Sequence, residues 1–362
     1  MNTASRKRSL AKSVQRAGFD ALLVTHPADI RYLSGFTGSL GALVISCGRA
    51  ILFVDGRYTE QAKQEATGTR VVIAPRSPLL AACEWVEAAG KRRCGYDPAH
   101  TTVAALTAMR AAVSASRRRG LFHATADLVG RQREIKDTEE ISCMREAAEL
   151  GCALFDASLE SLSSSLTEVQ VALDLEQRAR SAGADRMSFD TIVAGGAHSA
   201  LPHARPTAGA KLPRRGFVTL DFGVVWHGYC SDMTRTVHMG RASSEMRSVY
   251  DFVLEAQNAA IGQIAPGVQA GEVDEAARSI LRRAKLDTYF THSTGHGVGL
   301  EIHEQPRIGA KQLQRLEPGM IITIEPGVYL EGRFGVRIED MVLVTAHGCE
   351  VLTGSPKALI EL

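Results

Sequence analysis

Several features that mark whole classes of protein are missing from this sequence. It has no apolar run approaching the roughly 20 residues of a membrane span. The basic cluster Arg6-Lys7-Arg8 is followed by Lys12 and Arg16, and not by the apolar core of a signal peptide. The net charge is only +2, and Arg117-Arg118-Arg119 is a short run that suits a solvated helix end. We therefore expect a protein that binds neither membranes nor nucleic acid.

Cysteine pairs are also missing. The seven cysteines are odd in number and scattered, with no Cys-x-x-Cys spacing. This pattern is more typical of reduced thiols in a cytoplasmic protein than of a disulfide framework. Cys230 lies two residues before Asp232. Because free cysteine usually packs as a small hydrophobe, we expect it in the core.

The 362 residues exceed the usual size of a single core and divide into two parts. Up to about residue 125, helical and strand-like segments alternate as in an α/β domain, with a last helix expected over 101–116. Weak periodicity over 123–132 marks a connection, so we predict domains 1–130 and 131–362. In the second part, two helices followed by a strand pair occur twice. This order suggests an internal duplication, although the copies share no sequence identity.

Two acids occupy unusual positions within residues 217–237, a segment that resembles a β-hairpin turning at Trp226-His227-Gly228. Asp221 ends the first strand, and Asp232 lies inside the second, where aspartate is normally disfavoured. A hairpin can bring both side chains into one pocket. Buried carboxylates repel each other unless a cation neutralises them, so the pattern indicates a metal site. Two ordinary acids on a solvent-facing strand are the alternative.

A second strand pair, 320–325 with 336–344, repeats this pattern. Glu325 ends its first strand, and Glu339 lies inside its otherwise apolar second strand. Two hairpins that each carry two inward acids strengthen the metal interpretation. Three of the four acids have a threonine two residues away on the same face, where a hydroxyl can orient a ligating carboxylate: Thr219, Thr234 and Thr323.

Between the two hairpins stands His296, surrounded by glycine and threonine. Such neighbours allow the backbone to approach closely, as a ligand requires and a core histidine does not. Four carboxylates and one imidazole suit two divalent first-row ions, with manganese favoured by the oxygen-rich set and cobalt or zinc also acceptable. Two such ions acidify a shared water and polarise a carbonyl, which is the chemistry of hydrolysis. A serine nucleophile in Gly-x-Ser-x-Gly is absent.

These residues carry a resemblance to a known family. In order, the five candidates lie in Asp-Phe-Gly, Ser-Asp-Met-Thr-Arg-Thr, Thr-Gly-His-Gly-Val-Gly-Leu, Ile-Glu-Pro-Gly-Val-Tyr and Arg-Ile-Glu-Asp. This set resembles the pita-bread metallopeptidases. Gly-Phe-Thr-Gly-Ser and Val-Asp-Gly-Arg-Tyr are similar to the N-terminal domain of aminopeptidase P and prolidase. The resemblance covers nearly the whole chain and implies an α/β N-terminal domain followed by an α+β pita-bread (creatinase/aminopeptidase-like) catalytic domain.

The resemblance also implies a role for each metal ligand. His296 and Glu325 would bind one ion, Asp221 would bind the other, and Asp232 and Glu339 would bridge both.

Four further residues acquire roles in the same way. His203, His292 and His303 match positions that contact substrate or move protons, with His203 helping to stabilise the oxyanion. Without the neighbouring motifs, each would be read as an ordinary surface or core histidine. Arg337 shares a strand face with Glu339 and is expected to hold site carboxylates in place, with a plain surface ion pair as the alternative.

The implied activity is that of an X-Pro aminopeptidase, acting on peptides with proline at the second position. The alternative is prolidase, which cleaves dipeptides and carries an arginine before Glu-Pro-Gly. This interval holds Arg307, Lys311 and Arg315, and a rough alignment puts Lys311 at that place, which weakens the dipeptidase interpretation. Methionine aminopeptidase, creatinase and a non-catalytic binding protein on the same fold fit less well. A cytoplasmic homodimer is expected from the resemblance and from symmetry statistics.

Overall fold

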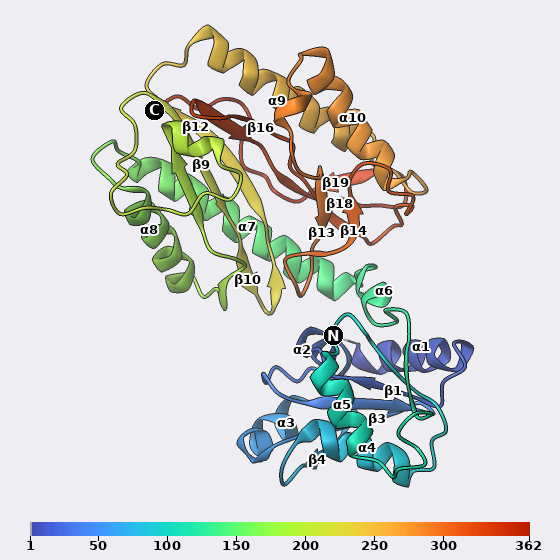
Figure 1. The fold of residues 1–362 in the computed structure, drawn as a ribbon. Helices are drawn as coiled ribbons and strands as arrows, with labels where there is room; N and C mark the ends of the chain where they lie inside the picture. Colours follow the sequence, from blue (N-terminus) through green and yellow to red (C-terminus); the bar gives the residue numbers. More distant parts are fainter. Residues whose placement is uncertain (1) are drawn as a thin grey trace. The chain divides into compact units, whose positions relative to one another are not determined.

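The computed structural model describes residues 2–362, which form two compact units (Figure 1). One unit ends at Arg133 and the other runs from Glu134 to Leu362, so the division falls close to the boundary drawn after residue 130. Among the described helices, none has both the length and the apolar character needed to cross a bilayer.

The N-terminal unit is built on a six-stranded mixed sheet with the strand order β4-β3-β2-β1-β5-β6. Strands β1, β5 and β6 run parallel to one another, whereas β2 is antiparallel to both of its neighbours. Apolar side chains of α4 and α5, such as Val86 and Met109, pack on sheet residues such as Leu23 and Val44. Its elements are α1 (Thr3–Arg16), β1 (Ala21–Val24), α2 (Pro27–Ser34), β2 (Ala42–Ser46), β3 (Arg49–Val54), η1 (Gly56–Tyr58), α3 (Thr59–Glu65), β4 (Arg70–Ile73), α4 (Pro78–Ala88), β5 (Cys94–Tyr96), α5 (Val103–Ala111), β6 (Phe122–Ala124) and α6 (Gly130–Arg133).

Two local predictions for this unit need correction. Helix α5 ends at Ala111 and not near residue 116, because Ser114 binds Glu87 of α4 through its backbone N–H (3.1 Å) and its hydroxyl (2.5 Å). Arg117-Arg118-Arg119 therefore follows in turns, beyond the helix end. Helix α2 was missed; it begins at a proline and ends at Ser34, before Gly35, whose φ of 84° stops the helix.

The C-terminal unit consists of helices on both sides of paired strands (Figure 1). Helices α7 and α8 share an apolar core with β8, β9 and β12, while α9 and α10 share one with β15, β17 and β18. Two helices followed by strands therefore occur twice, as the sequence indicated. The elements are α7 (Thr138–Ser161), α8 (Glu168–Ser181), β7 (Arg186–Met187), β8 (Ile192–Gly195), η2 (Gly196–Ala200), β9 (Gly216–Phe222), β10 (Val224–Trp226), β11 (Tyr229–Cys230), β12 (Met233–Met239), α9 (Ser244–Gly262), α10 (Ala270–Arg283), η3 (Asp287–Tyr289), β13 (Gly295–Gly297), β14 (Glu304–Ile308), β15 (Ile321–Ile324), β16 (Gly327–Leu330), β17 (Phe334–Arg337), β18 (Asp340–Val344) and β19 (Cys349–Val351).

The first long hairpin, β9 to β12, is interrupted near its middle. Strand β9 pairs with β12 and β10 pairs with β11, so Asp232 lies in the break between β11 and β12 and not inside a strand as predicted. At the facing break, a Cβ on Gly223 would lie 1.8 Å from the Ser231 carbonyl oxygen, so only glycine fits. The predicted turn is confirmed, with positive φ at His227 (48°) and Gly228 (86°).

The second long hairpin, β15 to β18, breaks in the same manner. Strand β15 pairs with β18 and β16 pairs with β17, so Glu325 follows β15 and Glu339 lies between β17 and β18, not within a strand. The backbone N–H of Glu339 donates to the Thr234 carbonyl of β12 (3.1 Å). The strand leaves its own hairpin at this residue to bond to the other hairpin, which explains the break.

Candidate metal centre

The five predicted ligands come together where the two hairpins break. The Nε2 atom of His296 lies 3.6 Å from Asp232 Oδ2 and 3.5 Å from Glu325 Oε1. One ligand atom each of Asp232, His296 and Glu339 lies within 4.8 Å of the others. Asp221, at the end of β9, is the cross-strand partner of Thr234, whose hydroxyl donates to Glu339 (2.6 Å).

Burial disfavours the ionised form of these carboxylates. Burial and then the Glu339 charge raise the pKa values of Asp232 and Glu325 well above their usual range. Burial followed by the Asp221 charge raises the pKa of Glu339 to about 8. Burial lowers the pKa of His296 to about 4, so its imidazole is neutral at pH 7. The cluster therefore lacks the positive charge that would keep its acids ionised. Without bound ions, some of these acids stay protonated.

The donor set fits divalent ions. First-row ions bind oxygen and nitrogen at about 2.0–2.2 Å, so ligand atoms around one ion lie roughly 3–3.5 Å apart, close to the spacings around His296. A neutral imidazole has a lone pair to give, and its Nδ1 lies 2.9 Å from the Gly297 carbonyl, which orients the ring. The four carboxylates supply the negative charge that two such ions require.

Arg337 is the guanidinium that contacts this cluster directly. It is only 5 % exposed, so it is not a surface ion pair. Its nitrogens donate to Asp221 Oδ2 (2.5 Å), Thr234 Oγ1 (3.0 Å), the Tyr329 hydroxyl (2.6 Å) and the Pro202 carbonyl (3.2 Å). Arg337, on the second hairpin, thereby holds Asp221 and Thr234 of the first hairpin in place.

Tyr329 is a site residue that the sequence reasoning missed. Besides accepting the bond from Arg337, its hydroxyl lies 2.9 Å from His292 Nε2. Burial raises the pKa of Tyr329 to about 12, so it remains a neutral phenol. The signal was present in the quoted Glu-Pro-Gly-Val-Tyr motif, where the tyrosine lies four residues after Glu325.

The three predicted histidines lie around the acids with different exposure. His292 is half-buried, and burial followed by the Arg337 charge lowers its pKa to about 4. His303 contacts the His296 ring edge-on at 4.4 Å between centroids, and burial lowers its pKa too. His203 is exposed, on the loop after η2, and its proximity contributes to the lowered pKa values of His292 and His303.

Two of the three threonines bind other partners than predicted. The Thr234 hydroxyl donates to Glu339 and not to Asp232, which lies two residues earlier in the sequence. Thr219 bonds to the hydroxyl of Thr236 (3.1 Å), its cross-strand partner, and not to Asp221. Thr323 matches the expectation, because its hydroxyl binds Glu325 and accepts the backbone N–H of His296 (3.1 Å). Pairing across strands decided these partners.

The glycines beside His296 permit a close backbone approach, as predicted. A Cβ on Gly295 would lie 1.8 Å from the Thr323 carbonyl oxygen, and one on Gly297 would lie 2.1 Å from that of Gln305. Cys230 is buried, with Sγ 3.9 Å from the Leu300 carbonyl, and burial raises its pKa to about 11. It is a core thiol.

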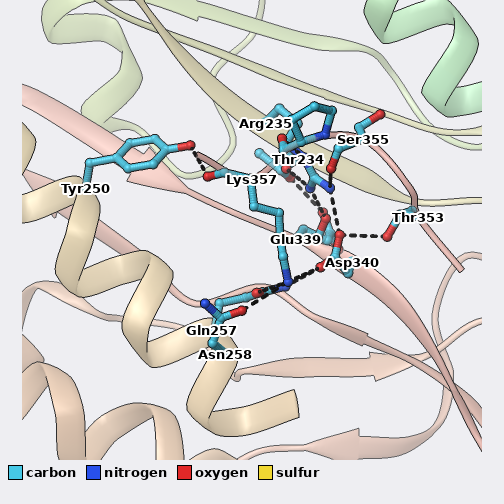
Figure 2. A network of polar contacts seen from close by, with 11 residues as sticks. Thr234, Arg235, Tyr250, Gln257, Asn258, Glu339, Asp340, Thr353, Ser355 and Lys357 are labelled. Carbon is cyan, nitrogen blue, oxygen red and sulfur yellow. Dashed lines mark hydrogen bonds and ion pairs between the residues drawn. The ribbon is translucent and has the colours of Figure 1, made fainter. Parts of the chain in front are cut away.

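Next to Glu339, a buried ion pair holds the junction of the hairpins (Figure 2). Arg235 donates to the Glu339 carbonyl (2.5 Å) and to Asp340 Oδ1 (2.7 Å). Asp340 Oδ2 accepts from Gln257 (2.7 Å) and lies 3.0 Å from Lys357 Nζ. Burial raises the pKa of Asp340, but Arg235 and Lys357 outweigh burial and keep it below its usual range. Asp340 is thus fully compensated by protein cations, unlike Glu339 one residue earlier.

Comparison with known proteins agrees with this geometry. The sequence profile of metallopeptidase family M24 matches residues 142–346, and that of the creatinase/prolidase N-terminal domain matches residues 6–135. The chain belongs to metallopeptidase family M24. This M24 chain is therefore a peptidase of a metal-dependent family, and the predicted α/β plus pita-bread fold is confirmed.

Relatives cover the M24 chain from end to end. The uncharacterized peptidase YqhT of Bacillus subtilis is 40% identical over 346 residues, which are 95% of this chain and 96% of that one. Among solved structures, an Xaa-Pro dipeptidase from Bacillus anthracis has a TM-score of 0.94 at 38% identity, covering 100% of both chains. An X-Pro aminopeptidase from Thermotoga maritima has a TM-score of 0.88 at 34% identity, covering 97% of this chain and 100% of that one.

Proposed function

We propose that this M24 peptidase hydrolyses the peptide bond that precedes proline, with Asp221, Asp232, His296, Glu325 and Glu339 holding two divalent ions. Similar solved structures named as an Xaa-Pro dipeptidase and an X-Pro aminopeptidase support this substrate class. When bound, the ions supply Lewis acidity and an activated water. Manganese is the proposed metal because the donors are mostly oxygen.

The surrounding side chains prepare the site. Arg337 holds Asp221 in place, and its charge favours a neutral His292. Because Tyr329 binds both Arg337 and His292, it can fix the imidazole in one orientation. His203 and His303, on the exposed side, are proposed to bind the substrate carbonyl and to move protons at the scissile amide.

Our proposal for the length of the substrate rests on Arg307. It lies on β14 directly opposite His296 of β13, so both side chains leave the same face of the sheet. The Arg307 side chain is exposed, and a guanidinium there can bind the free carboxylate of a dipeptide's proline. Lys311, which the alignment placed in this role, instead lines a groove with Glu272 and Glu275 of α10. This contrast favours Xaa-Pro dipeptidase activity.

X-Pro aminopeptidase activity is the second candidate. It is supported by the similarity to the Thermotoga maritima enzyme. The homodimer and the cytoplasmic location stay predictions from the sequence.

Paired substrates test the proposal. The manganese-loaded enzyme is assayed on Xaa-Pro, on the same dipeptide with an amidated carboxyl terminus, and on Xaa-Pro-Yaa. We expect the free dipeptide to be preferred, and Arg307→Ala to raise its KM at least tenfold while leaving the amide unaffected. Lys311→Ala is the matched control and should change neither. Equal kcat/KM on the dipeptide and the tripeptide would instead establish aminopeptidase activity.

A further inference from the structure

Helix α10 carries a buried acid that is not one of the proposed metal ligands. Asp274 is only 1 % exposed. It directly follows Val273, which belongs to the apolar stripe of α10, so Asp274 lies at the edge of the helix face that packs on the core. Burying a carboxylate is unfavourable unless partners compensate it, and Asp274 has a partner on each oxygen.

The two oxygens of Asp274 bind different parts of the chain. Oδ2 accepts from Nε of Arg278, one helical turn later (2.8 Å). Oδ1 accepts from the hydroxyl of Thr294, which is fully buried (2.8 Å). Thr294 lies two residues before His296, and its carbonyl accepts the backbone N–H of Glu325 (2.8 Å). One threonine therefore connects Asp274 to the neighbourhood of two proposed metal ligands.

Arg278 holds the preceding part of the same segment. Its other two nitrogens donate to the carbonyls of Phe290 (3.3 Å) and His292 (2.6 Å). The guanidinium also lies over the Phe290 ring, 4.3 Å from the centroid. The Phe290 ring meets the His292 ring edge-on, with centroids 5.0 Å apart. Asp274 and Arg278 together therefore hold residues 290–294 through two carbonyls and one hydroxyl.

The position of this segment determines how the His292 ring meets Tyr329. Nδ1 of His292 lies 2.8 Å from the Ser293 carbonyl, which can only accept, so the proton of the neutral ring is on Nδ1. Nε2 is then the acceptor for the Tyr329 hydroxyl, 2.9 Å away. Because hydrogen bonds weaken steeply when donor and acceptor are misaligned, a shift of the His292 backbone would break this contact.

We propose that Asp274 and Arg278 are positioning residues of the peptidase site, which hold residues 290–294 so that His292 meets Tyr329. Each acts through the backbone or a hydroxyl of this segment, and not by binding a metal ion. The inference rests on the proposed function for its effect on turnover, whereas the position of the His292 ring can be measured without a substrate.

The competing interpretation is that the Asp274–Arg278 pair only stabilises the fold. Diethyl pyrocarbonate, which acylates accessible imidazoles, separates the two. Manganese-saturated full-length wild type, Arg278→Ala, Arg278→Lys and Arg282→Ala are labelled, and the labelled peptides are quantified by mass spectrometry against the exposed His347. Arg282→Ala is the matched control, because Arg282 is exposed on the same helix and pairs with Glu275.

Labelling of His292 should rise at least fivefold in both Arg278 variants and stay unchanged in Arg282→Ala. Lysine keeps the positive charge beside Asp274 but lacks the planar fork that donates to three partners. Arg278→Lys therefore keeps the proposal testable if Arg278→Ala does not fold. Wild-type labelling of His292 in either folded Arg278 variant would overturn the proposal, since a pair that only stabilises the fold leaves the ring in place.

Steady-state kinetics provide a second measurement. On an Xaa-Pro dipeptide, Arg278→Lys should lower kcat roughly 10- to 100-fold, because small misplacements of site groups slow turnover strongly. Its KM and manganese content should stay at the wild-type level, and Arg282→Ala should match the wild type throughout. Wild-type kcat, or a loss of manganese that accounts for the slower turnover, would refute the positioning role. A wild type that does not cleave Xaa-Pro peptides would refute the proposed function and leave the labelling test unaffected.

Discussion

Removing the catalytic metals should reverse the usual effect of pH on the stability of this protein. Burial raises the pKa of Glu339 to about 8, from an ordinary value of 4.5 in the unfolded chain. Between these values the folded state binds the extra proton, so the free energy of unfolding falls as pH rises. His292 and His296, with pKa values lowered to about 4, act in the opposite direction, mainly below their ordinary value of 6.5. From pH 6.5 to 8 each ring offsets about 0.4 kcal/mol, which is less than the effect of the acids.

The expected magnitude follows from the linkage relation. Each pH unit over which one proton is held only by the folded state changes the free energy of unfolding by about 1.4 kcal/mol. For Glu339, half-titrated at pH 8, the loss between pH 6.5 and 8 is about 1.6 kcal/mol. Asp232 and Glu325 also have raised pKa values and can only add to this loss.

Urea unfolding of chelator-treated and manganese-loaded protein at pH 6.5 and 8 measures the effect. The metal-free protein should lose stability across the window, and the manganese-loaded protein should not, because ions hold the carboxylates as anions at both pH values. Glu339→Gln removes the titrating group, so its metal-free form should lose less. A metal-free wild type whose stability is constant or rises from pH 6.5 to 8 would refute the reasoning.

Three further changes test individual parts of the site. Asp232→Ala should abolish peptidase activity and lower the metal content together, because one residue is proposed to bind both ions. Tyr329→Phe should lower turnover by roughly 10- to 100-fold with the fold intact, because the phenol oxygen links Arg337 to His292. Gly295→Ala should lower the free energy of unfolding by about 3 kcal/mol, because its Cβ would meet the Thr323 carbonyl oxygen at 1.8 Å.

Each change has a matched control. Asp251→Ala and Tyr289→Phe alter exposed residues of the same unit, and Gly120→Ala adds a Cβ with nothing within 4 Å. All three should behave as the wild type. Full metal content in Asp232→Ala, wild-type turnover in Tyr329→Phe, or equal unfolding curves for the two glycine variants would contradict the corresponding assignment.

Local patterns were enough to find the strands, the turns and the donor residues. Alternation of apolar residues identified both long hairpins, and the glycine at position 228 marked the turn of the first, since a positive φ is accessible to few other residues. The same patterns missed that each hairpin breaks at its acids. The break at Glu339 depends on a bond to Thr234, which lies 105 residues earlier. Periodicity within a window contains no such information.

The sequence by itself determined which side chains could bind metal, because an acid within an apolar stretch of sequence is unusual whatever fold that stretch adopts. Only the tertiary structure decided what each acid does. Glu339 and Asp340 are adjacent and equally buried, yet Asp340 meets Arg235 and Lys357, whereas Glu339 faces other carboxylates and has a raised pKa. The physical reason is that the free energy of a buried charge depends on its neighbours in space. Those neighbours come from helices and strands far along the chain.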